Sequence, residues 1–403
     1  MEEFKTYTLE ELSLNKGTYG IAASAVPYDD SKLTYLRITD INDDGTLNTQ
    51  SLMSVDEPNA SDYLLKKNDI VFARTGNSTG RTYFYQGNEC PLVYAGFLIK
   101  FSIDEKKVNP LLLKYYTHSR IYYDWVKSFD TGGTRGNINA KTYGNMPIRI
   151  PASRKTQDKI VDILSSLDEK IALNRRINDN LEQQAQALFK SWFVDFEPFK
   201  EGKFVDSEMG MIPEGWKVGR LCDFAIITMG QSPSGDSYNE NKEGMVFYQG
   251  RSEFGNRFPS IKLYTTDPNR IAEKNSILIS VRAPVGDINI ASQDCCIGRG
   301  LASIKARGNY NSFLYYTVKS MKKEFDVYNG EGTVFGSINK DSLNSMPVII
   351  PTTEEISNFE KITSVLDYNY EKCHRENIIL TSLRDNLLPR LMSGELKIND
   401  LNC

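Results

Sequence analysis

The sequence is poor in the residues that many enzymes use for acid–base catalysis and metal binding. It contains two histidines in 403 residues, His118 and His374, which lie far apart in the chain. A metal site built on several histidines, or a triad with a histidine base, does not fit this composition. The six cysteines include no Cys-x-x-Cys pair, which predicts reduced thiols and no disulfide framework.

Common cofactor and catalytic motifs are also missing. No phosphate-binding Gly-x-x-x-x-Gly-Lys-Ser/Thr loop occurs, and Gly76–Gly80 and Gly298–Gly300 lack the spacing of a dinucleotide-binding turn. A methyltransferase that acts on base amino groups would carry an Asp/Asn-Pro-Pro-aromatic tetrapeptide, to which Asp267-Pro268-Asn269 is the nearest approach. We therefore expect a protein without catalytic residues, metal site or cofactor of its own.

Long apolar runs and a strong net charge are absent as well. No stretch approaches the roughly 20 apolar residues that span a membrane, and Met1–Gly20 has no basic start followed by an apolar core. We expect a cytoplasmic protein that binds no membrane. The formal net charge of −4 does not exclude nucleic acid, because acidic helices can conceal a local basic patch in the sum.

What the sequence does contain is a repeat. Gly132–Pro151 and Gly332–Pro351 are identical at eight of twenty positions, where chance gives about one. The shared residues of the first copy are Gly132, Gly136, Ile138, Asn139, Met146, Pro147, Ile150 and Pro151. Strand-like segments that match one another precede the two copies, among them Asn68–Phe72 and Asn275–Ile279. The chain is therefore an internal duplication of a domain that mixes helices and strands.

A long amphipathic helix is predicted after each copy. A seven-residue spacing occurs five times along one face of each helix, and the two series are 199 residues apart. The first series is Ile160, Leu167, Asn174, Leu181 and Leu188, and the second is Phe359, Leu366, Cys373, Leu380 and Leu387. The neighbouring positions are filled by Leu164, Ile171, Ile177, Trp192, Ile362 and Leu383. This spacing is typical of helices that pair along a seam, in which Asn174 is expected to fix the register.

The arrangement of these helices follows from their length and from the repeat. Both exceed the usual length of a globular helix, which favours pairing over the alternative that each packs only on its own domain. The simplest pairing has a pseudo-twofold axis and is an antiparallel coiled coil, about 50 Å long at 1.5 Å per residue. A charge placed at Leu167 or Leu366 is then expected to separate the helices.

The predicted fold class is α+β, with two mixed α/β domains in tandem that are separated and spaced by the two long helices. The expected boundaries are 1–151 for the first domain, 152–197 for the first helix, 198–212 for a linker, 213–351 for the second domain, 352–394 for the second helix and 395–403 for a tail. A capping box at Thr352 and Glu355 predicts the start of the second helix, and Pro389 and Gly394 predict its end. Between the shared elements the domains differ almost completely, as expected of two different recognition surfaces.

Arginine and asparagine recur on glycine-rich turns of both domains. The candidates are Arg74, Asn77, Ser78, Arg81, Arg135 and Asn137 in the first domain, and Arg251, Arg257, Arg282 and Arg299 in the second. Arginine can pair with guanine, asparagine can pair with adenine, and backbone amides at such turns suit phosphate. For any one of these residues a solvated surface charge is the simpler alternative. Their repetition at matching turns predicts a surface that binds double-stranded DNA.

Taken together, these segments resemble the specificity (S) subunits of type I restriction-modification systems. The segments that carry the resemblance are Gly136–Pro151, Ile160–Ile171, Leu188–Phe199, Ile212–Trp216 and Gly336–Lys340, and the resemblance covers nearly the whole chain. It implies two target recognition domains, each of which reads one half of a bipartite, asymmetric DNA site. It also implies that the helices set the spacer between the half-sites and dock two methyltransferase (M) subunits.

The resemblance assigns the chemistry to partner subunits. Adenine N6 methylation with S-adenosylmethionine, and cleavage of unmethylated DNA with ATP and Mg by restriction (R) subunits, would serve defence against phage. One departure is that Cys373 replaces Asn174 in the second helix, whose tail lacks counterparts of Trp192 and Phe196, so the two docking surfaces need not be equivalent. The alternatives are a stand-alone enzyme, which no motif supports, and a coiled-coil adaptor whose globular domains bind proteins.

Overall fold

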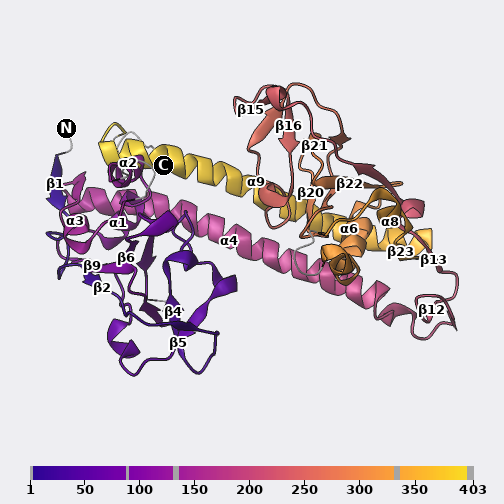
Figure 1. The fold of residues 1–403 in the computed structure, drawn as a ribbon, viewed down its shortest axis with the longest axis horizontal. Coiled ribbons are helices and arrows are strands. Elements are labelled where there is room, and N and C mark those ends of the chain that lie inside the picture. Colours follow the sequence, from indigo (N-terminus) through magenta and orange to yellow (C-terminus); the bar gives the residue numbers. More distant parts are fainter. Residues whose placement is uncertain (1–2, 88–89, 130–135, 331–335, 397–403) are drawn as a thin grey trace. The chain divides into compact units, whose positions relative to one another are not determined.

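The computed structural model describes residues 3–87, 90–129, 136–330 and 336–396 (Figure 1). The chain divides into two compact units, of which unit 1 comprises Met1–Asn174 and Arg375–Cys403, and unit 2 comprises Arg175–His374. Both boundaries fall inside the long helices, α4 (Arg154–Phe193) and α9 (Thr353–Ser393). Each unit therefore contains one domain, the first part of one long helix and the last part of the other.

The domain of unit 1 is built from two four-stranded sheets and a strand pair. One sheet has the order β2 (Thr18–Tyr19), β9 (Leu98–Ser102), β6 (Asp69–Ala73) and β7 (Thr82–Tyr85). The other has the order β3 (Ala25–Val26), β5 (Met53–Val55), β4 (Leu33–Leu36) and β8 (Leu92–Tyr94). The pair is β1 (Phe4–Thr8) with β10 (Pro147–Pro151), and the helices are α1 (Pro110–Tyr116), α2 (Arg120–Lys127) and α3 (Ala140–Gly144).

The domain of unit 2 has a four-stranded sheet, a five-stranded sheet and two strand pairs. The four-stranded sheet is β14 (Ala225–Met229), β22 (Leu301–Ala306), β19 (Ile277–Ser280) and β20 (Ile288–Ile290). The five-stranded sheet is β15 (Tyr238–Asn239), β17 (Leu263–Thr265), β16 (Met245–Tyr248), β21 (Cys295–Ile297) and β18 (Ile271–Ala272). The pairs are β13 (Lys217–Arg220) with β23 (Pro347–Ile350) and β11 (Phe204–Val205) with β12 (Ile212–Pro213). The short helices are α5 (Leu221–Phe224), α6 (Asn311–Ser320), α7 (Lys322–Asp326) and α8 (Lys340–Ser345).

The two domains share one topology. The sheet β2–β9–β6–β7 corresponds in strand order and direction of pairing to β14–β22–β19–β20. In the other sheet the pair β4 and β8 is parallel, as is its counterpart β16 and β21. The predicted mixture of helices and strands is thus confirmed, and the duplicated sequence has duplicated its strand order.

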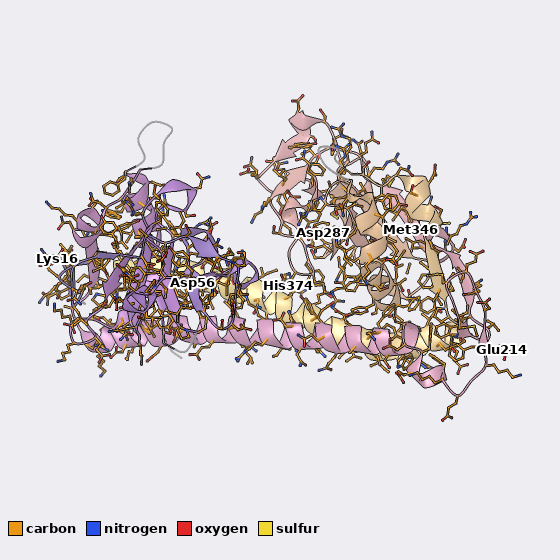
Figure 2. The ribbon with its side chains drawn as sticks, turned by 60° about the horizontal axis from the view of Figure 1, so that its bottom comes forward. Lys16, Asp56, Glu214, Asp287, Met346 and His374 are labelled. Atoms are coloured by element: carbon orange, nitrogen blue, oxygen red, sulfur yellow. The ribbon has the colours of Figure 1, made fainter. Side chains whose placement is uncertain are left out.

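The identities in the repeated turn have local physical reasons. A Cβ on Gly136 or Gly336 would lie within 2.2 Å or 2.0 Å of a backbone carbonyl oxygen, so no larger residue fits there. Asn139 caps α3 by accepting the N–H of Thr142, and Asn339 caps α8 in the same way. The residue equivalent to Met146, Met346, is 4% exposed and lies inside the packed part of unit 2 (Figure 2).

The start of α9 agrees with the predicted capping box, and its end agrees with the predicted boundary at 394. Thr352 Oγ1 accepts the N–H of Glu355 at 3.4 Å, and the Glu355 carboxylate accepts the N–H of Thr352 at 2.9 Å. Of the two residues that predicted the end, Pro389 lies within the helix, which continues to Ser393. Gly394 follows with φ +79°, the left-handed conformation that glycine adopts without strain.

The ends of the long helices contribute to the cores of the domains. In unit 1 the last turns of α9 bury Leu388, Leu391 and Met392 among the apolar side chains of the first domain. In unit 2 the last turns of α4 bury Phe189 and Phe193 among those of the second domain. The alternative in which each long helix packs only on its own domain does not hold, because the last turns of each helix complete the core of the unit that contains the other domain.

The predicted seam series is buried at some positions and partly exposed at others. Ile160 and Asn174 are 1% exposed and Phe359 is fully buried. The partly exposed members are Leu167, Leu181, Leu188, Leu366, Cys373, Leu380 and Leu387. A second series with the same spacing is buried throughout, and its members are Leu164, Ile171, Asn178 and Ala185. Among the neighbouring positions, Ile177, Ile362 and Leu383 are 36%, 45% and 44% exposed, which corrects their assignment to the buried face.

Glu360 lies on α9 in unit 2, and its carboxylate meets the first turn of α6. Its Oε1 accepts the N–H of Phe313 at 2.8 Å, and burial raises the pKa of Glu360 from its ordinary 4.5 to about 7. Because the pKa is higher in the folded than in the unfolded state, the fold binds the proton more tightly. The stability that Glu360 contributes is therefore fully present below pH 4.5 and is lost as the pH rises through 7.

We expect Glu360→Gln to remove this pH dependence. The amide keeps an acceptor for the N–H of Phe313 and does not ionise. The free energy of unfolding of the variant, relative to that of the wild type, should therefore rise by about 2 kcal/mol between pH 5 and 7.5. Urea unfolding of both proteins at the two pH values measures the difference. Stability curves that run parallel across this range would contradict the assignment.

Candidate nucleic-acid interface

Three segments of unit 1 that are far apart in the sequence meet at Arg74, directly after β6. Its N–H donates to the carbonyl oxygen of Phe97 at 3.1 Å, and its own carbonyl oxygen accepts the N–H of Ile138 at 3.0 Å. Tyr19 joins them, because its hydroxyl accepts the N–H of Ala140 at 3.1 Å. The fold thus places the turn after β6, the turn before β9 and the repeated turn beside one another.

Two exposed aromatic rings hold the side chain of Arg74. Its guanidinium carbon lies 5.3 Å from the ring centroid of Tyr19 and 5.7 Å from that of Phe97, and its Nε donates to the carbonyl oxygen of Gly96 at 3.3 Å. Tyr19 is 44% exposed and Phe97 is 54% exposed, although rings of this size are usually buried. Together with the exposed Asn77 and Asn137, they form what we call the unit 1 loop surface.

The remaining candidates of unit 1 fare differently. Ser78 is 7% exposed, and its Oγ accepts from Arg81. Arg81 itself donates to the Asp43 carboxylate at 2.7 Å and to the carbonyl oxygen of Ile41 at 3.1 Å. Both side chains therefore fasten the turn, and Ser78 is corrected from a DNA contact to a buried structural residue. Arg135 lies outside the described residues.

Unit 2 has the same backbone hydrogen bonds around its repeated turn, but its arginine, Arg282, is one residue further along the chain than Arg74 is in unit 1. Val281 takes the place of Arg74, since its N–H donates to the carbonyl oxygen of Gly300 at 2.9 Å and its carbonyl oxygen accepts the N–H of Ile338 at 3.0 Å. Arg282 follows and is exposed. Its backbone forms an isolated antiparallel β-bridge with that of Ser337, an exposed residue of the repeated turn. The framework of the loops is thus repeated, but the side chains that it presents are not.

Two more predicted arginines lie on turns that adjoin Arg282. Arg299 is exposed, and its N–H donates to Ser232 Oγ at 3.3 Å. The turn of Arg299 meets the end of β16, because the N–H of Gly298 donates to the carbonyl oxygen of Tyr248 at 2.8 Å. Arg251 follows that strand, is 51% exposed, and pairs with Asp287 at 2.8 Å. The exposed side chains of Arg251, Arg282, Arg299 and Ser337 form what we call the unit 2 loop surface.

Arg257 does not belong to this surface. Its side chain is 3% exposed and pairs with Glu182 and Asp367 of the two long helices. Burial opposes its charge, but Asp367 and the neighbouring groups raise the pKa of Arg257 above its ordinary value. The prediction that Arg257 contacts DNA is therefore wrong, because a guanidinium committed to two carboxylates in the interior cannot reach a base.

Sequence reasoning missed Tyr19, Phe97 and Ser337. Large aromatic residues are usually buried, as Tyr115 and Tyr116 are, whereas Tyr19 and Phe97 are exposed. The available signal was an aromatic residue beside a glycine, in Tyr19-Gly20 and Gly96-Phe97, since neither pair fits the alternation of a buried strand. Exposed rings beside an arginine can stack on bases or sugars, so these residues add to the predicted chemistry.

Within residues 3–87, 90–129, 136–330 and 336–396, no three His, Cys, Asp or Glu side chains are grouped to hold a metal ion. Over the same residues, neither long helix nor any shorter one has the length and apolarity to cross a bilayer. Both loop surfaces offer hydrogen-bond donors, and the unit 1 loop surface adds the exposed rings of Tyr19 and Phe97, which suit recognition.

Comparison with known proteins also relates this chain to proteins that recognise DNA. Residues 1–183 and 213–380 both match the sequence model of the type I restriction modification DNA specificity domain. The chain is 32% identical over 346 residues to the type I restriction enzyme MjaX specificity subunit of Methanocaldococcus jannaschii, covering 83% of this chain and 80% of that protein. It is 26% identical to the type I restriction enzyme HindI specificity subunit of Haemophilus influenzae, covering 98% of this chain and all of that protein.

A solved structure shares the fold. The type I restriction-modification system S subunit from M. genitalium superposes with a TM-score of 0.58 and 16% identity, over 97% of this chain and 96% of the other. At this identity the similarity concerns the fold and not the residues that recognise a target. The loop surfaces of this chain therefore have to be judged on their own side chains.

Proposed function

Because this chain belongs to the family of type I restriction-modification specificity subunits, we propose that each of its two units reads one half of a bipartite, asymmetric DNA site. A specificity subunit is not itself the catalyst. Adenine N6 methylation with S-adenosylmethionine, and cleavage with ATP and Mg, would be carried out by methyltransferase and restriction subunits assembled with it on DNA in the cytoplasm.

The observation that carries the proposal is the pair of loop surfaces. Both are built on the same backbone hydrogen bonds around the repeated turn, at Ile138 in unit 1 and Ile338 in unit 2. The side chains differ, with a ring-held Arg74 in one unit and an exposed Arg282 in the other. A constant framework with different exposed donors is what two unlike half-sites require, because bases are read by the pattern of donors and acceptors.

The proposal assigns two tasks to α4 and α9. As an antiparallel coiled coil with a pseudo-twofold axis, they would set the spacer between the half-sites and dock two methyltransferase subunits. Support comes from unit 1, where Asn174 Nδ2 donates to Glu376 Oε2 at 2.7 Å and to Asn377 Oδ1 at 2.9 Å. Exposed apolar side chains remain on both helices, for example Leu173 at 43% and Ile379 at 66%, and these suit a protein partner.

Methylation mapping tests the proposal directly. The chain is expressed with its methyltransferase, and N6-methyladenine is located by single-molecule sequencing, with cells that lack the chain as the control. We expect a motif of two unlike halves separated by a fixed gap, present only with the chain. If a stable complex with the methyltransferase marks no new motif, the recognition function is wrong and the adaptor alternative, in which the domains bind proteins, replaces it.

Single arginine substitutions should act on one half-site each. Arg74→Ala is expected to relax recognition of one half and Arg282→Ala that of the other, each by about 1–3 kcal/mol, the discrimination of a good base contact. Competition binding of the complex to duplexes with single base changes measures this. The control is Arg120→Ala, which removes the same charge from a helix surface, where its side chain is 88% exposed and pairs with Asp124. Equal losses on all sequences would indicate phosphate contacts instead.

A further inference from the structure

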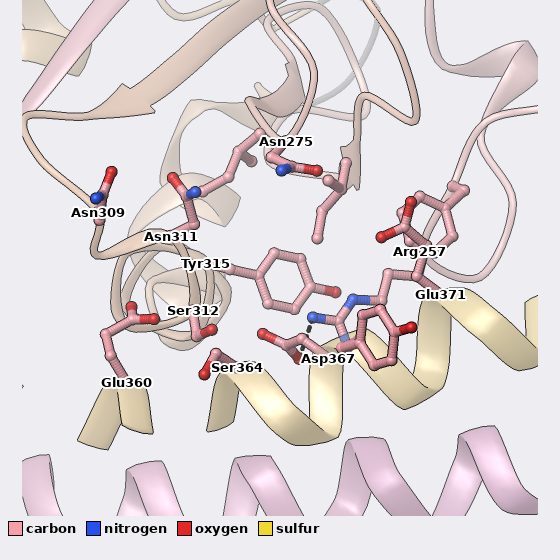
Figure 3. A pocket seen from close by; sticks show the side chains of 14 residues that line it. Arg257, Asn275, Asn309, Asn311, Ser312, Tyr315, Glu360, Ser364, Asp367 and Glu371 are labelled. Carbon is pink, nitrogen blue, oxygen red and sulfur yellow. Dashed lines mark hydrogen bonds and ion pairs between the residues drawn. The ribbon is translucent and has the colours of Figure 1, made fainter. Parts of the chain in front are cut away.

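A buried cluster of charges joins the second domain to both long helices in unit 2. Arg257 donates through one terminal nitrogen to Glu182 of α4 at 3.0 Å and through the other to Asp367 of α9 (Figure 3). Lys319 of α6 also pairs with Glu182. The hydroxyl of Tyr316 donates to Asp367 at 3.2 Å, so two segments of the domain converge on the helices.

Aromatic rings enclose the guanidinium. Its carbon lies 4.6 Å from the ring centroid of Tyr315 and 4.8 Å from that of Tyr370 on α9. The side chain of Arg257 is 3% exposed, while those of Glu182 and Asp367 are 16% and 21% exposed. A planar guanidinium held by two carboxylates and two rings has few alternative geometries.

Unit 1 contains an equivalent cluster. Asp168 of α4, which corresponds to Asp367 in the repeat, pairs with Lys114 of the first domain at 3.0 Å and with Arg384 of α9 at 2.9 Å. The hydroxyl of Tyr115, on α1, donates to the same carboxylate at 3.1 Å. Burial opposes the charge of Asp168, yet Lys114 and Arg384 hold its pKa below the ordinary value. In each unit, then, a mostly buried network of ion pairs ties the domain to both helices.

Apolar packing does not surround the unit 2 cluster on every side. A cavity of about 260 Å³ adjoins it, lined by Arg257, Tyr315, Glu360, Asp367 and Asn275 among others (Figure 3). The close packing between the domain and α9 lies elsewhere, around Phe313 and Phe359. Apolar contacts at other points also hold the domain, among them Phe193 of α4 with Phe313 and Phe258 with Tyr370 of α9. The ion pairs of Arg257 add a polar constraint that depends on the orientation of the domain.

Buried ion pairs of this kind are better explained by the orientation that they impose on a domain than by the stability that they add to the fold. Taking charges out of water offsets most of their attraction, so a buried ion pair adds little to stability compared with apolar residues of the same volume. What it does add is a penalty for every arrangement in which one charge loses its partner. The clusters therefore select one orientation of each domain on the helices.

We propose that the clusters centred on Arg257 and Asp168 are positioning devices that fix the angle of each recognition domain on the helices and thereby set the gap between half-sites that the complex accepts. The inference rests on the proposed function. One inserted base pair moves a half-site by about 3.4 Å and turns it by about 35°, so a domain that rotates on its helix accepts gaps that a fixed domain rejects.

The test uses the assembled complex with its methyltransferase and duplexes carrying the mapped motif with the natural gap or with one base pair added or removed. Methylation rates give a ratio of the natural to the altered gap. The main variant, E182Q/R257M/D367N, removes three mostly buried charges together, and only Lys319, whose side chain is 35% exposed, loses a partner. R257K is the conservative variant, because a lysine keeps the charge but cannot hold two carboxylates in one fork. K274M is the control, since Lys274 pairs with Glu371 between the same domain and α9 but is 44% exposed.

We expect the gap ratio to fall about tenfold in the triple variant and less in R257K, with K274M equal to the wild type. The rate on the natural gap changes little, which a general loss of folded protein would not produce. If the triple variant does not fold, R257K decides. A gap ratio like that of the wild type in every folded variant overturns the positioning role while the proposed function stands. A wild-type complex that marks no bipartite motif overturns the proposed function itself, and this inference with it.

Discussion

Arg257→Ala is expected to lower the free energy of unfolding of unit 2 by about 3–5 kcal/mol. The substitution removes the cation that both Glu182 and Asp367 face in the interior. Lys319 remains beside Glu182, so most of the cost falls on Asp367, whose carboxylate is left without its cation. The cost is large because the Asp367 side chain is only 21% exposed, so water replaces just part of the interaction that its carboxylate loses.

Tryptophan fluorescence in urea can follow this unit by itself. Trp192 and Trp216 lie in unit 2 and the third tryptophan, Trp125, lies in unit 1, so a Trp125→Phe background reports on unit 2. Arg299→Ala is the matched control, because it removes an exposed arginine from the same unit and should cost no more than about 0.5 kcal/mol. A loss for Arg257→Ala as small as that of the control would show that water reaches the cluster.

Phe359→Ala is expected to lower the free energy of unfolding by a similar amount, about 3–5 kcal/mol, because it removes apolar packing. Phe359 is fully buried on the first turns of α9, and its ring centroid lies 5.1 Å from that of Phe193 and 5.9 Å from that of Phe189, both at the end of α4. It also faces Phe313 of the domain at 6.4 Å. Truncation opens a cavity where three elements meet, and aromatic rings cannot collapse far enough to fill it.

The control for Phe359 lies one turn along the same helix. Ile362 was predicted to share the buried face but is 45% exposed, so Ile362→Ala should cost less than about 1 kcal/mol. The same urea experiment compares the two variants with the wild type. Equal losses of stability at Phe359 and Ile362 would contradict this difference in burial and would support the predicted helix face, on which both residues are buried.

The sequence predicted the framework of this protein well because local chemistry decides that framework. Gly136 and Gly336 leave no room for a side chain, and Asn139 and Asn339 cap helices through their nearest neighbours. Constraints between residues that are close in the sequence survive duplication as identities, because the caps act over three residues. The glycines face carbonyl groups of Phe129 and Tyr328, which shortly precede them in the chain. The repeat, the mixed fold and the position of the capping box at Thr352 could therefore be predicted.

The candidate site was predicted only in part. Arg74, Arg282 and Arg299 are exposed or partly exposed on turns, as expected from glycine-rich segments. Arg257 stands on a similar turn, but the residues it pairs with are 75 and 110 positions away in the chain, and nothing local announces them. Tyr19 and Phe97 were overlooked for the converse reason, since large rings are buried more often than they are exposed.

The sequence by itself determined the duplicated domain, the turn that carries its identities and the two long helices, because propensity, capping and periodicity are properties of neighbouring residues. Only the tertiary structure decided which helix positions are buried and which arginine, Arg257, pairs with carboxylates of the long helices. Asn178 is polar and Ala185 is small, yet both are buried, as Leu164 and Ile171 are. Burial depends on what the rest of the chain packs against a position, and charge becomes structural only where distant carboxylates meet it away from water.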